Sequence, residues 1–417
     1  MTPANATSSC PLPTRRWSAP ALRLTLSAAL VATSLLGASA HAAAPAKPAA
    51  AQPPELPAET LTTTDLKSAG KDRIYVADVA IAHIVDGRLR VFSAKDGKVL
   101  GMINTGFAGN FALSAQADEI YIATTYLSRG GRGDRTDILE VWDADTLGFK
   151  YEVTLPPKRA QTLNYRGMVR PSGNGKFVMV QNATPATSVT VVDLANKKVA
   201  TEVATPGCWG IWPAASGARF SMLCGDGKVA TITLDDAGQV AERQVSDKLF
   251  DADQDAWYHT AEQQGDRAWF LSFKGTLTEL DLGGAVAKQK SAVAVVSAAA
   301  AKAGWRPGGY QAFAVDPAAK VAVVAMHDKG SEGTHKRPAR QLWIVDLATG
   351  RQLATAPGKG TASLTFARAS KRLQALDGET GAMNVWTLND TGKAPALKLV
   401  TTVKRAGEAA LHIESGD

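Results

Sequence analysis

The sequence has few of the side chains that build self-contained active sites and metal centres. It contains 3 cysteines and 6 histidines in 417 residues, and the histidines are scattered along the chain. It has no His-Glu-x-x-His motif, no paired cysteine motif, no P-loop and no Gly-x-Ser-x-Gly elbow. We therefore expect no catalytic residue, no cofactor-binding residue and no metal ligand in this chain.

The composition excludes several other classes of protein. Three cysteines are too few for a small fold built on disulfides. With 45% hydrophobic and 20% charged residues, the chain is neither a disordered nor a collagen-like sequence, and it is long enough to bury a large core. Its length would allow two or three domains or one closed repeat array.

The N-terminal region lacks an apolar run long enough to cross a membrane. Residues 24–36 form a largely apolar run of about 13 residues, where a span needs about 20. Arg15 and Arg16 precede this run and small residues follow it, which is the order of a signal peptide. We predict a signal peptide at 1–42, a flexible Ala/Pro-rich leader at 43–58 and a folded domain at 59–417, in an exported protein without a membrane span.

The positive charge is smaller than it first looks. The formal net charge is +7, and cleavage would remove Arg15, Arg16 and Arg23 but no acidic residue, leaving about +4. A charge this small on a chain of this length indicates no particular class of partner, so we expect no nucleic acid as a partner.

Cleavage would also remove Cys10 and leave Cys208 and Cys224 in an oxidising compartment. Their one possible pairing would close a loop of about 15 residues, worth about 3 kcal/mol in the chain-entropy model. A redox dithiol and a thiolate metal site are the alternatives, but neither has a CxxC or Cys/His cluster behind it. We predict a structural disulfide.

Two series of short strands repeat along the chain with a period near 49 residues. The first begins with a charged or polar residue followed by alternating apolar residues, at 73–76, 119–122, 176–179, 219–222, 267–270, 320–323 and 372–375. The second ends in a polar turn, at 89–93, 139–143, 189–193, 230–234, 277–281, 342–346 and 383–387.

This periodicity predicts an all-β fold, a seven-bladed β-propeller of four-stranded antiparallel blades. A single blade cannot cover its own apolar faces, so blades stack around an axis until the ring closes. Residues 409–414 are expected to complete a blade begun near Leu61. Residues 291–302 are the clearest helical window, and a solenoid is the alternative architecture.

Two polar loops are candidate binding sites. Arg129, Arg132 and Arg135 lie in a glycine-rich loop that would suit an anion or a partner as well as a plain surface loop. Asp251, Asp253 and Asp255 resemble the start of a Ca²⁺ loop, but the required glycine does not follow, which favours a solvated acidic turn.

Several long segments resemble one known family, the large subunits of periplasmic quinoprotein amine dehydrogenases. They lie at 124–137, 140–147, 155–159, 181–188, 207–209, 304–310 and 332–336. The segments at 182–188 and 332–336 resemble the aromatic (aralkylamine) enzyme more than the methylamine enzyme. The resemblance runs from about Glu59 to near the C-terminus.

The resemblance implies a periplasmic α₂β₂ heterotetramer in which this chain is noncatalytic. The small, disulfide-rich subunit would carry the tryptophan tryptophylquinone cofactor and the catalytic residues. Primary, aromatic or aralkyl amines would be oxidised to aldehyde and ammonia, and electrons would pass to azurin or another blue copper protein. A stand-alone exported propeller that binds or scaffolds other molecules, and a methylamine-type large subunit, are the alternatives.

One residue of this chain is implied at the substrate entrance. The family places a Phe in the loop after the first blade's hairpin, and here it falls on Phe107, in the loop 104–110. An aromatic ring on a Gly-flanked loop suits a gate for an apolar amine. The alternative is that Phe107 only packs between blades.

Overall fold

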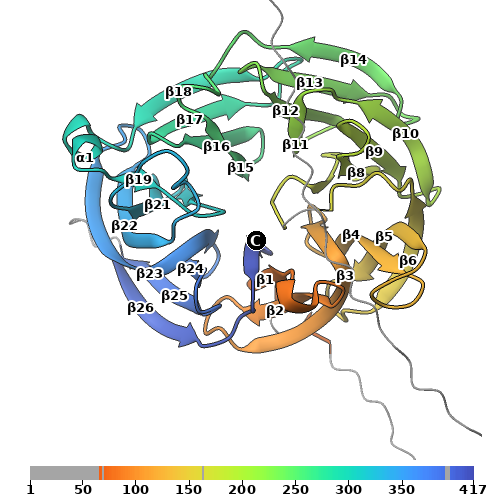
Figure 1. The fold of residues 1–417 in the computed structure, drawn as a ribbon, viewed down its shortest axis with the longest axis horizontal. Coiled ribbons are helices and arrows are strands. Elements are labelled where there is room, and N and C mark those ends of the chain that lie inside the picture. The colour runs from red at the N-terminus through yellow and green to blue at the C-terminus, as the bar shows by residue number, and fades with distance from the viewer. Residues whose placement is uncertain (1–64, 68–69, 162–163, 390–394) are drawn as a thin grey trace, which may run out of the picture. The chain divides into compact units, whose positions relative to one another are not determined.

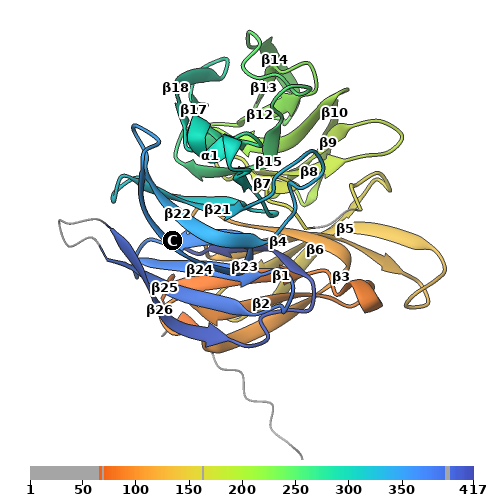
Figure 2. The same ribbon diagram turned by 60° about the vertical axis from the view of Figure 1, so that its left-hand side comes forward.

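The computed structural model describes residues 65–67, 70–161, 164–389 and 395–417, which form an almost entirely β-stranded unit (Figure 1). The predicted signal peptide at 1–42 and leader at 43–58 lie outside the described residues, and so does Cys10. Figures 1 and 2 show the sheets of the unit 61–417 following one another around a common axis.

Three sheets in the middle of the chain are simple four-stranded antiparallel meanders. The first contains β7 (Val169–Pro171), β8 (Phe177–Asn182), β9 (Ser188–Asp193) and β10 (Lys198–Ala204). The second contains β11 (Cys208–Pro213), β12 (Arg219–Cys224), β13 (Val229–Leu234) and β14 (Val240–Val245). The third contains β15 (Trp257–Gln264), β16 (Arg267–Ser272), β17 (Thr276–Asp281) and β18 (Lys288–Ala294).

Two long strands join further sheets in pairs. The first half of β3 (Val99–Leu113) pairs with β2 and its second half with β4, and β23 (Gln352–Ala367) pairs likewise with β22 and β24. Around β3 lie β27 (Ala410–Ser415), β1 (Arg73–Asp78), β2 (Gly87–Ser93), β4 (Glu119–Leu127), β5 (Arg135–Asp143) and β6 (Phe149–Leu155). Around β23 lie β19 (Arg306–Pro307), β20 (Phe313–Asp316), β21 (Val321–His327), β22 (Ala339–Asp346), β24 (Arg372–Asp377), β25 (Met383–Asn389) and β26 (Ala396–Val403).

The two predicted strand series are the second and third strands of these sheets. The first series falls on β1, β4, β8, β12, β16, β21 and β24, and the second on β2, β5, β9, β13, β17, β22 and β25. Second strands such as β1 and β8 are buried along their whole length, because a neighbouring sheet covers each face. Outer strands such as β14 are exposed along their whole length.

The core lies between the sheets rather than within one centre. Val178 and Val180 of β8 pack with Leu139 and Val141 of β5, and clusters of the same kind join each later sheet to the next. A further cluster packs Leu376 of the β24 sheet against the β1 strand, so the last sheet covers the first. The all-β propeller of four-stranded antiparallel sheets is confirmed, and seven blades stays a prediction that this grouping supports.

The predicted helix at 291–302 is wrong in its first half. Residues 288–294 form the exposed strand β18, which pairs with β17, and only Ala298–Lys302 form the helix α1. Ser297 begins the helix, since its hydroxyl accepts a hydrogen bond from Ala300 N at 3.2 Å. A 3₁₀ turn covers Ile81–His83. Within the part of the chain that the structure describes, no helix is long and apolar enough to span a membrane.

The C-terminal strand closes the ring. β27 pairs antiparallel with β1, with Val76 opposite Ile413, as the sequence predicted for residues 409–414. The C-terminus consequently lies near the centre of the view in Figure 1. A closed ring leaves no unpaired central edge between its first and last segments.

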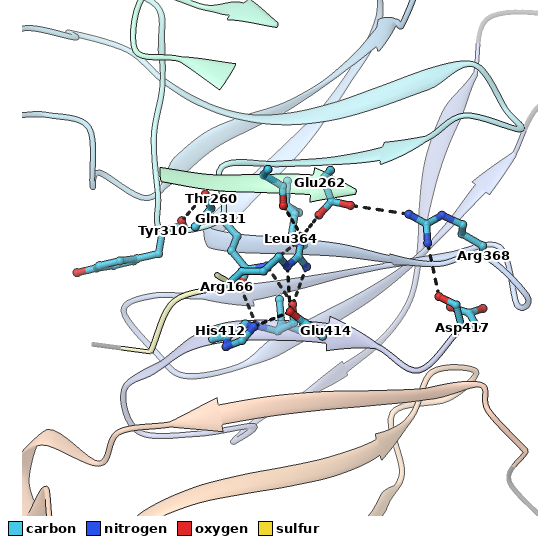
Figure 3. Close-up of polar contacts among 12 residues, drawn as sticks. Arg166, Thr260, Glu262, Tyr310, Gln311, Leu364, Arg368, His412, Glu414 and Asp417 are labelled. Carbon is cyan, nitrogen blue, oxygen red and sulfur yellow. Dashed lines mark hydrogen bonds and ion pairs between the residues drawn. The ribbon is translucent and has the colours of Figure 1, made fainter. Parts of the chain in front are cut away.

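A buried charge network surrounds the axis where β27 enters (Figure 3). Arg166 forms ion pairs with Glu262 of β15 and, at 3.3 Å, with Glu414 of β27. Arg170 of β7 lies 3.2 Å from the same Glu414 oxygen, and His412 Nε2 lies 3.0 Å from it. Burial alone would raise the pKa of Glu414, but the charge of Arg170 and the contacts with His412 and Arg166 hold that pKa well below its usual range.

Replacing Glu414 tests how strongly this network holds the ring. Glu414→Gln leaves Arg166 and Arg170 buried with less negative charge to balance them, so we expect the free energy of unfolding to fall by about 3 kcal/mol. Urea denaturation of the full chain measures this. Asp236→Asn, which removes an exposed pair with Lys176, is the matched control and should leave the midpoint unchanged. Equal midpoints for wild type and Glu414→Gln would contradict the role of the network.

Candidate functional site

One face of the ring collects most of the long connections. In an antiparallel meander, the loop between the second and third strands and the linker to the next sheet emerge at the same end. We call this end the linker face. It contains the second-to-third loops at 79–86, 128–134, 183–187, 225–228, 273–275, 328–338 and 378–382, and the described linker residues 156–161, 164–168, 205–207, 246–256, 295–312 and 404–409.

Backbone hydrogen bonds tie each linker to a neighbouring loop. Ala183 N donates to Lys158 O at 2.9 Å, Gly225 N to Gly207 O at 2.9 Å, and Gly309 N to His335 O at 2.9 Å. These bonds pair backbone N–H and C=O groups that have no partner within a sheet. They also join the separate loops into one continuous surface. Rigid loops of this kind are suited to binding.

The segments that resemble amine dehydrogenase large subunits gather on the linker face. Each of these segments contributes to it except 140–147, which lies in β5 and the turn at the opposite end. That turn is fixed locally, because the Asp143 carboxylate accepts hydrogen bonds from Asp145 N at 3.0 Å and Thr146 N at 2.7 Å. The linker face is therefore our candidate site.

The prediction of a separate loop at 104–110 is wrong, because these residues belong to the continuous strand β3. We keep the name Phe107 loop for this stretch, which lies on the linker face where β3 passes from one sheet to the next. The Phe107 backbone pairs with Thr125 of β4, and the register then shifts before Asn110. Its side chain is partly buried, and its neighbours Gly106 and Ala108 both have left-handed backbones, with φ of 56° and 47°. The Phe107 and Ala108 carbonyls accept hydrogen bonds from buried Arg159, at 2.6 Å and 3.0 Å.

The predicted disulfide is present on the same face. Cys208 and Cys224 are directly opposite each other in the β11–β12 pair, with Cα atoms 4.0 Å apart, and their sulfurs are bonded. The bond joins the linker that enters β11 to the end of β12. Neighbouring Trp209 packs against Ala160 and Tyr165, so this bond supports the middle of the linker face.

A cavity of about 740 Å³ opens on the linker face between the β15 and β21 sheets. Its aromatic lining residues are Tyr165, Trp257, Tyr258, Phe273 and Tyr310, and its charged or titratable ones include Asp253, Asp255, His259, Lys274, Arg306, Glu332, His335 and Lys336. Tyr258 supports the wall, since its hydroxyl donates to Pro307 O at 2.8 Å and also lies 3.2 Å from His335 O. The volume and mixed lining are those of a binding pocket.

The inner wall of this cavity connects to the Phe107 loop. Tyr165 N donates to Asn110 Oδ1 at 3.2 Å, and the Asn164 side chain donates to Gly109 O. The Tyr165 ring contacts His259 edge to face, with centroids 4.3 Å apart. The cavity and the proposed entrance residue are therefore linked by one short segment.

His259 is held uncharged at this wall. Burial, together with the charges of Lys336 and His335, lowers the pKa of His259 to about 4, and its Nε2 has no hydrogen-bond partner among the described residues. Burial and neighbouring Tyr310 raise the pKa of Tyr165 to about 12. Lys336 Nζ lies 5.6 Å from the Tyr310 ring centroid, within cation–π range. At neutral pH this part of the wall is therefore an aromatic surface beside the exposed Lys336 cation.

The two polar loops predicted from the sequence have separate outcomes. The β4–β5 connection is a hairpin loop in which Arg129 and Arg132 are exposed, whereas Arg135 grips Asp137 with two hydrogen bonds, at 2.8 Å and 2.6 Å. A partner contact at Arg129 and Arg132 stays a prediction.

Asp251, Asp253 and Asp255 form a turn in which the Asp251 carboxylate accepts bonds from Asp253 N and Gln254 N, at 3.1 Å and 3.0 Å. Lys248 Nζ lies 2.8 Å from the same carboxylate. No group of three or more His, Cys, Asp or Glu side chains among the described residues is placed to hold a metal ion.

Sequence reasoning identified part of this site. Tyr310, Glu332, His335 and Lys336 belong to segments that carried the resemblance. Arg159 also belongs to such a segment, 155–159, but the sequence assigned it no role. His259 and Tyr165 were missed, because their roles come from contacts across 55 or more positions of the chain. A lone histidine in a strand, or a lone tyrosine in a linker, carries no local signal for such contacts.

One close pair of tryptophans among the described residues includes a ring that a substrate could not reach. Trp305 and Trp343 are a close pair, with ring centroids 5.4 Å apart. Trp343 is 4% exposed, belongs to the core between two sheets, and donates from Nε1 to Gln341 Oε1 at 2.9 Å. Because it is buried there, an amine could not reach the Trp343 ring.

Comparison with known sequences gives one consistent family. The model for the methylamine dehydrogenase heavy chain (MADH) matches residues 70–404. The methylamine dehydrogenase heavy chain of Methylobacillus flagellatus is 27% identical over 339 residues, which cover 79% of this chain and 84% of that protein. That of Methylorubrum extorquens is 26% identical over 337 residues, covering 79% and 80%.

Solved structures at lower identity share the fold alone. A protein from Lactobacillus plantarum superposes with a TM-score of 0.58 at 14% identity, covering 82% of this chain and 98% of that one. The periplasmic gluconolactonase of Pseudomonas aeruginosa gives a TM-score of 0.55 at 14% identity, again covering 82% and 98%.

The neutral state of His259 predicts a pH dependence of stability. Because the folded pKa is near 4 and the unfolded value near 6.5, the unfolded chain gains a proton first as the pH falls between these values. Stability should therefore fall over this window by about 3 kcal/mol more in wild type than in His259→Phe, which cannot titrate. Urea denaturation at pH 7, 5.5 and 4 measures the difference between the two curves, and parallel curves would overturn the assignment.

Proposed function

The chain belongs to the methylamine dehydrogenase heavy chain family, and from that premise we propose that it is the large subunit of a periplasmic amine dehydrogenase. The observation that carries the proposal is the family match over residues 70–404, which spans most of the described domain. We propose that the protein is exported by its N-terminal signal peptide and assembles with a small subunit as an α₂β₂ heterotetramer.

In this proposal the chemistry belongs to the small subunit. That subunit would hold tryptophan tryptophylquinone, which accepts the two electrons of a primary amine as the amine becomes aldehyde and ammonia. Azurin or another blue copper protein would be the next acceptor. This chain would contribute the aromatic walls and exposed charges of the linker-face cavity, which suit contact with substrate and partner.

We propose that the linker face is where the small subunit docks. It brings together the family-like segments, the disulfide and a cavity with aromatic walls, and it exposes Ile81 and Tyr126 at 58% and 39%. Exposed apolar side chains on a surface of well-anchored loops are typical of protein interfaces. Phe107, on the same face, would line the substrate entrance between the subunits.

The preferred amine is a separate part of the proposal. The segments at 182–188 and 332–336 favour an aromatic or aralkyl amine, and Glu332 and Lys336 of the second segment line the cavity. The names of the compared relatives specify methylamine, which is therefore the second candidate substrate.

Purification of the full chain from its native cells tests the assembly. We expect an equimolar small chain to co-purify, with a quinone absorbance and amine-dependent reduction of an acceptor dye, whereas this chain expressed alone should be colourless and inactive. A monomer that purifies without a partner would favour a stand-alone propeller. A quinone spectrum from this chain alone would contradict the noncatalytic role.

Two charge-reversal variants test whether the small subunit docks on the linker face. Lys336→Glu on the linker face should reduce recovery of the small chain about tenfold, because it reverses an exposed charge beside the cavity. Lys95→Glu, in the β2–β3 turn at the opposite end, is the matched control and should leave recovery unchanged. Equal recovery of both variants would remove this part of the linker face from the interface.

The role of Phe107 predicts a change in amine selectivity. Phe107→Ala widens the entrance, so the ratio of kcat/KM for phenethylamine to that for methylamine should rise by about tenfold, with the quinone absorbance retained. Phe107→Leu should shift the ratio less, because it keeps apolar volume. Phe149→Ala, which removes an exposed ring from β6, is the control and should have no effect. An unchanged ratio in Phe107→Ala would remove Phe107 from the site.

A further inference from the structure

Arg159 is an unusual buried cation because no carboxylate pairs with it directly. It lies in the linker between β6 and β7 and is 2% exposed. Among the described residues no acidic group lies within 4.0 Å of its guanidinium. Burial lowers its pKa to about 10, which still leaves the group protonated at neutral pH.

The guanidinium is instead satisfied by the Phe107 loop. Its two terminal nitrogens donate to Phe107 O at 2.6 Å and Ala108 O at 3.0 Å, the carbonyls of two consecutive residues. Its Nε donates to Thr125 Oγ1 at 3.0 Å, in the strand residue that pairs with Phe107. A planar fork of five donors can make such bonds at once, and a lysine cannot.

The hydrogen bonds from Arg159 to Phe107, Ala108 and Thr125 form a clamp, and Thr125 connects this clamp to the Asp137 carboxylate. The Thr125 hydroxyl donates to Asp137 Oδ1 at 2.7 Å, and Asp137 in turn accepts two hydrogen bonds from Arg135. The linker itself is anchored on the next sheet, since Ala160 N donates to Gln181 O and Arg159 forms a bridge with Asn182. The clamp therefore has support on both sides.

The loop needs such support because its backbone is not in a common conformation. Ala108 has φ of 47°, which is uncommon for a residue with a side chain, and Gly106 has φ of 56°. A Cβ at Gly106 would lie 2.8 Å from Thr124 Oγ1, so the backbone also runs close against β4. Without hydrogen bonds from other segments, backbone conformations of lower energy would be open to this loop.

We propose that Arg159 is the positioning residue of the entrance: it fixes the Phe107 and Ala108 carbonyls and thereby the place of the Phe107 ring, and so sets which amines pass. The inference rests on the proposed role of Phe107 at the substrate entrance. Arg159 acts through the Phe107 loop and needs no contact with substrate.

A double-mutant cycle in the assembled dehydrogenase tests the inference. Arg159→Gln should shift the phenethylamine-to-methylamine ratio of kcat/KM by about fivefold, with the quinone absorbance per tetramer unchanged. In the Phe107→Ala background the same substitution should shift it less than about twofold, because the ring it positions is gone. Arg159→Lys, which keeps the charge but loses the fork, should fall between wild type and Arg159→Gln.

A second buried arginine separates positioning from general stability. Arg73 is 1% exposed and donates to Ala144 O at 2.6 Å and Leu66 O at 2.7 Å, away from the Phe107 loop. Arg73→Gln should lower the thermal midpoint as Arg159→Gln does but leave the amine ratio at the wild-type value. A shift of the ratio in Arg73→Gln would show that loss of stability alone alters selectivity, and would overturn the inference.

The remaining outcomes distinguish a failure of the Arg159 inference from a failure of the proposed role of Phe107. If Phe107→Ala shifts the ratio but neither Arg159 variant does, Arg159 is not a positioning residue while Phe107 keeps its role. If the effects of Arg159→Gln and Phe107→Ala multiply, Arg159 acts by another route and the inference is wrong. If Phe107→Ala leaves the amine ratio unchanged, Phe107 does not line the entrance, and the inference about Arg159 is wrong as well.

Discussion

The architecture depends on the closure of the ring by one strand. β27 pairs with β1 across nearly the whole length of the chain, and it carries Glu414 to the axis, where Arg166 and Arg170 meet it. The same network reaches β15 through Glu262, so charges from three separate sheets are balanced at one point. Each sheet covers its apolar faces only by packing on its neighbours, which makes closure a condition for burying the first and last sheets.

The connections at the two ends of the ring differ in length and in how they are held. At the end opposite the linker face, turns such as 143–148 and 346–350 are short and fixed by their own aspartates, since Asp346 Oδ1 accepts bonds from Ala348 N and Thr349 N. These turns need no neighbour to keep their shape. On the linker face the connections are longer and depend on one another, so that face can hold a cavity and an interface while the sheets stay the same.

The sequence predicted the parts of the fold whose signal is local. Second and third strands are buried between sheets, so their apolar pattern repeats clearly, and the pairing of Cys208 with Cys224 followed from the cysteine count. First strands such as β7 are only three residues long, and outer strands such as β18 are exposed and polar, so neither produced a recognisable pattern. That is why the sequence favours a helix over the whole of 291–302. At the candidate site, Phe107 came from resemblance, whereas Arg159 and His259 acquire their roles only through contacts between distant segments.

The contrast between Arg166 and Arg159 bears on whether the proposed entrance at Phe107 can move. Arg166 is neutralised by carboxylates, so its charge would stay balanced if a nearby loop shifted. Arg159 is stabilised by the carbonyl dipoles of the Phe107 loop itself, and movement of that loop would leave a buried guanidinium short of acceptors. The left-handed residues beside Phe107, Gly106 and Ala108, are thus held in place by the cost of leaving that buried charge without acceptors. Selectivity in such a site follows from where the ring is held rather than from how often it opens.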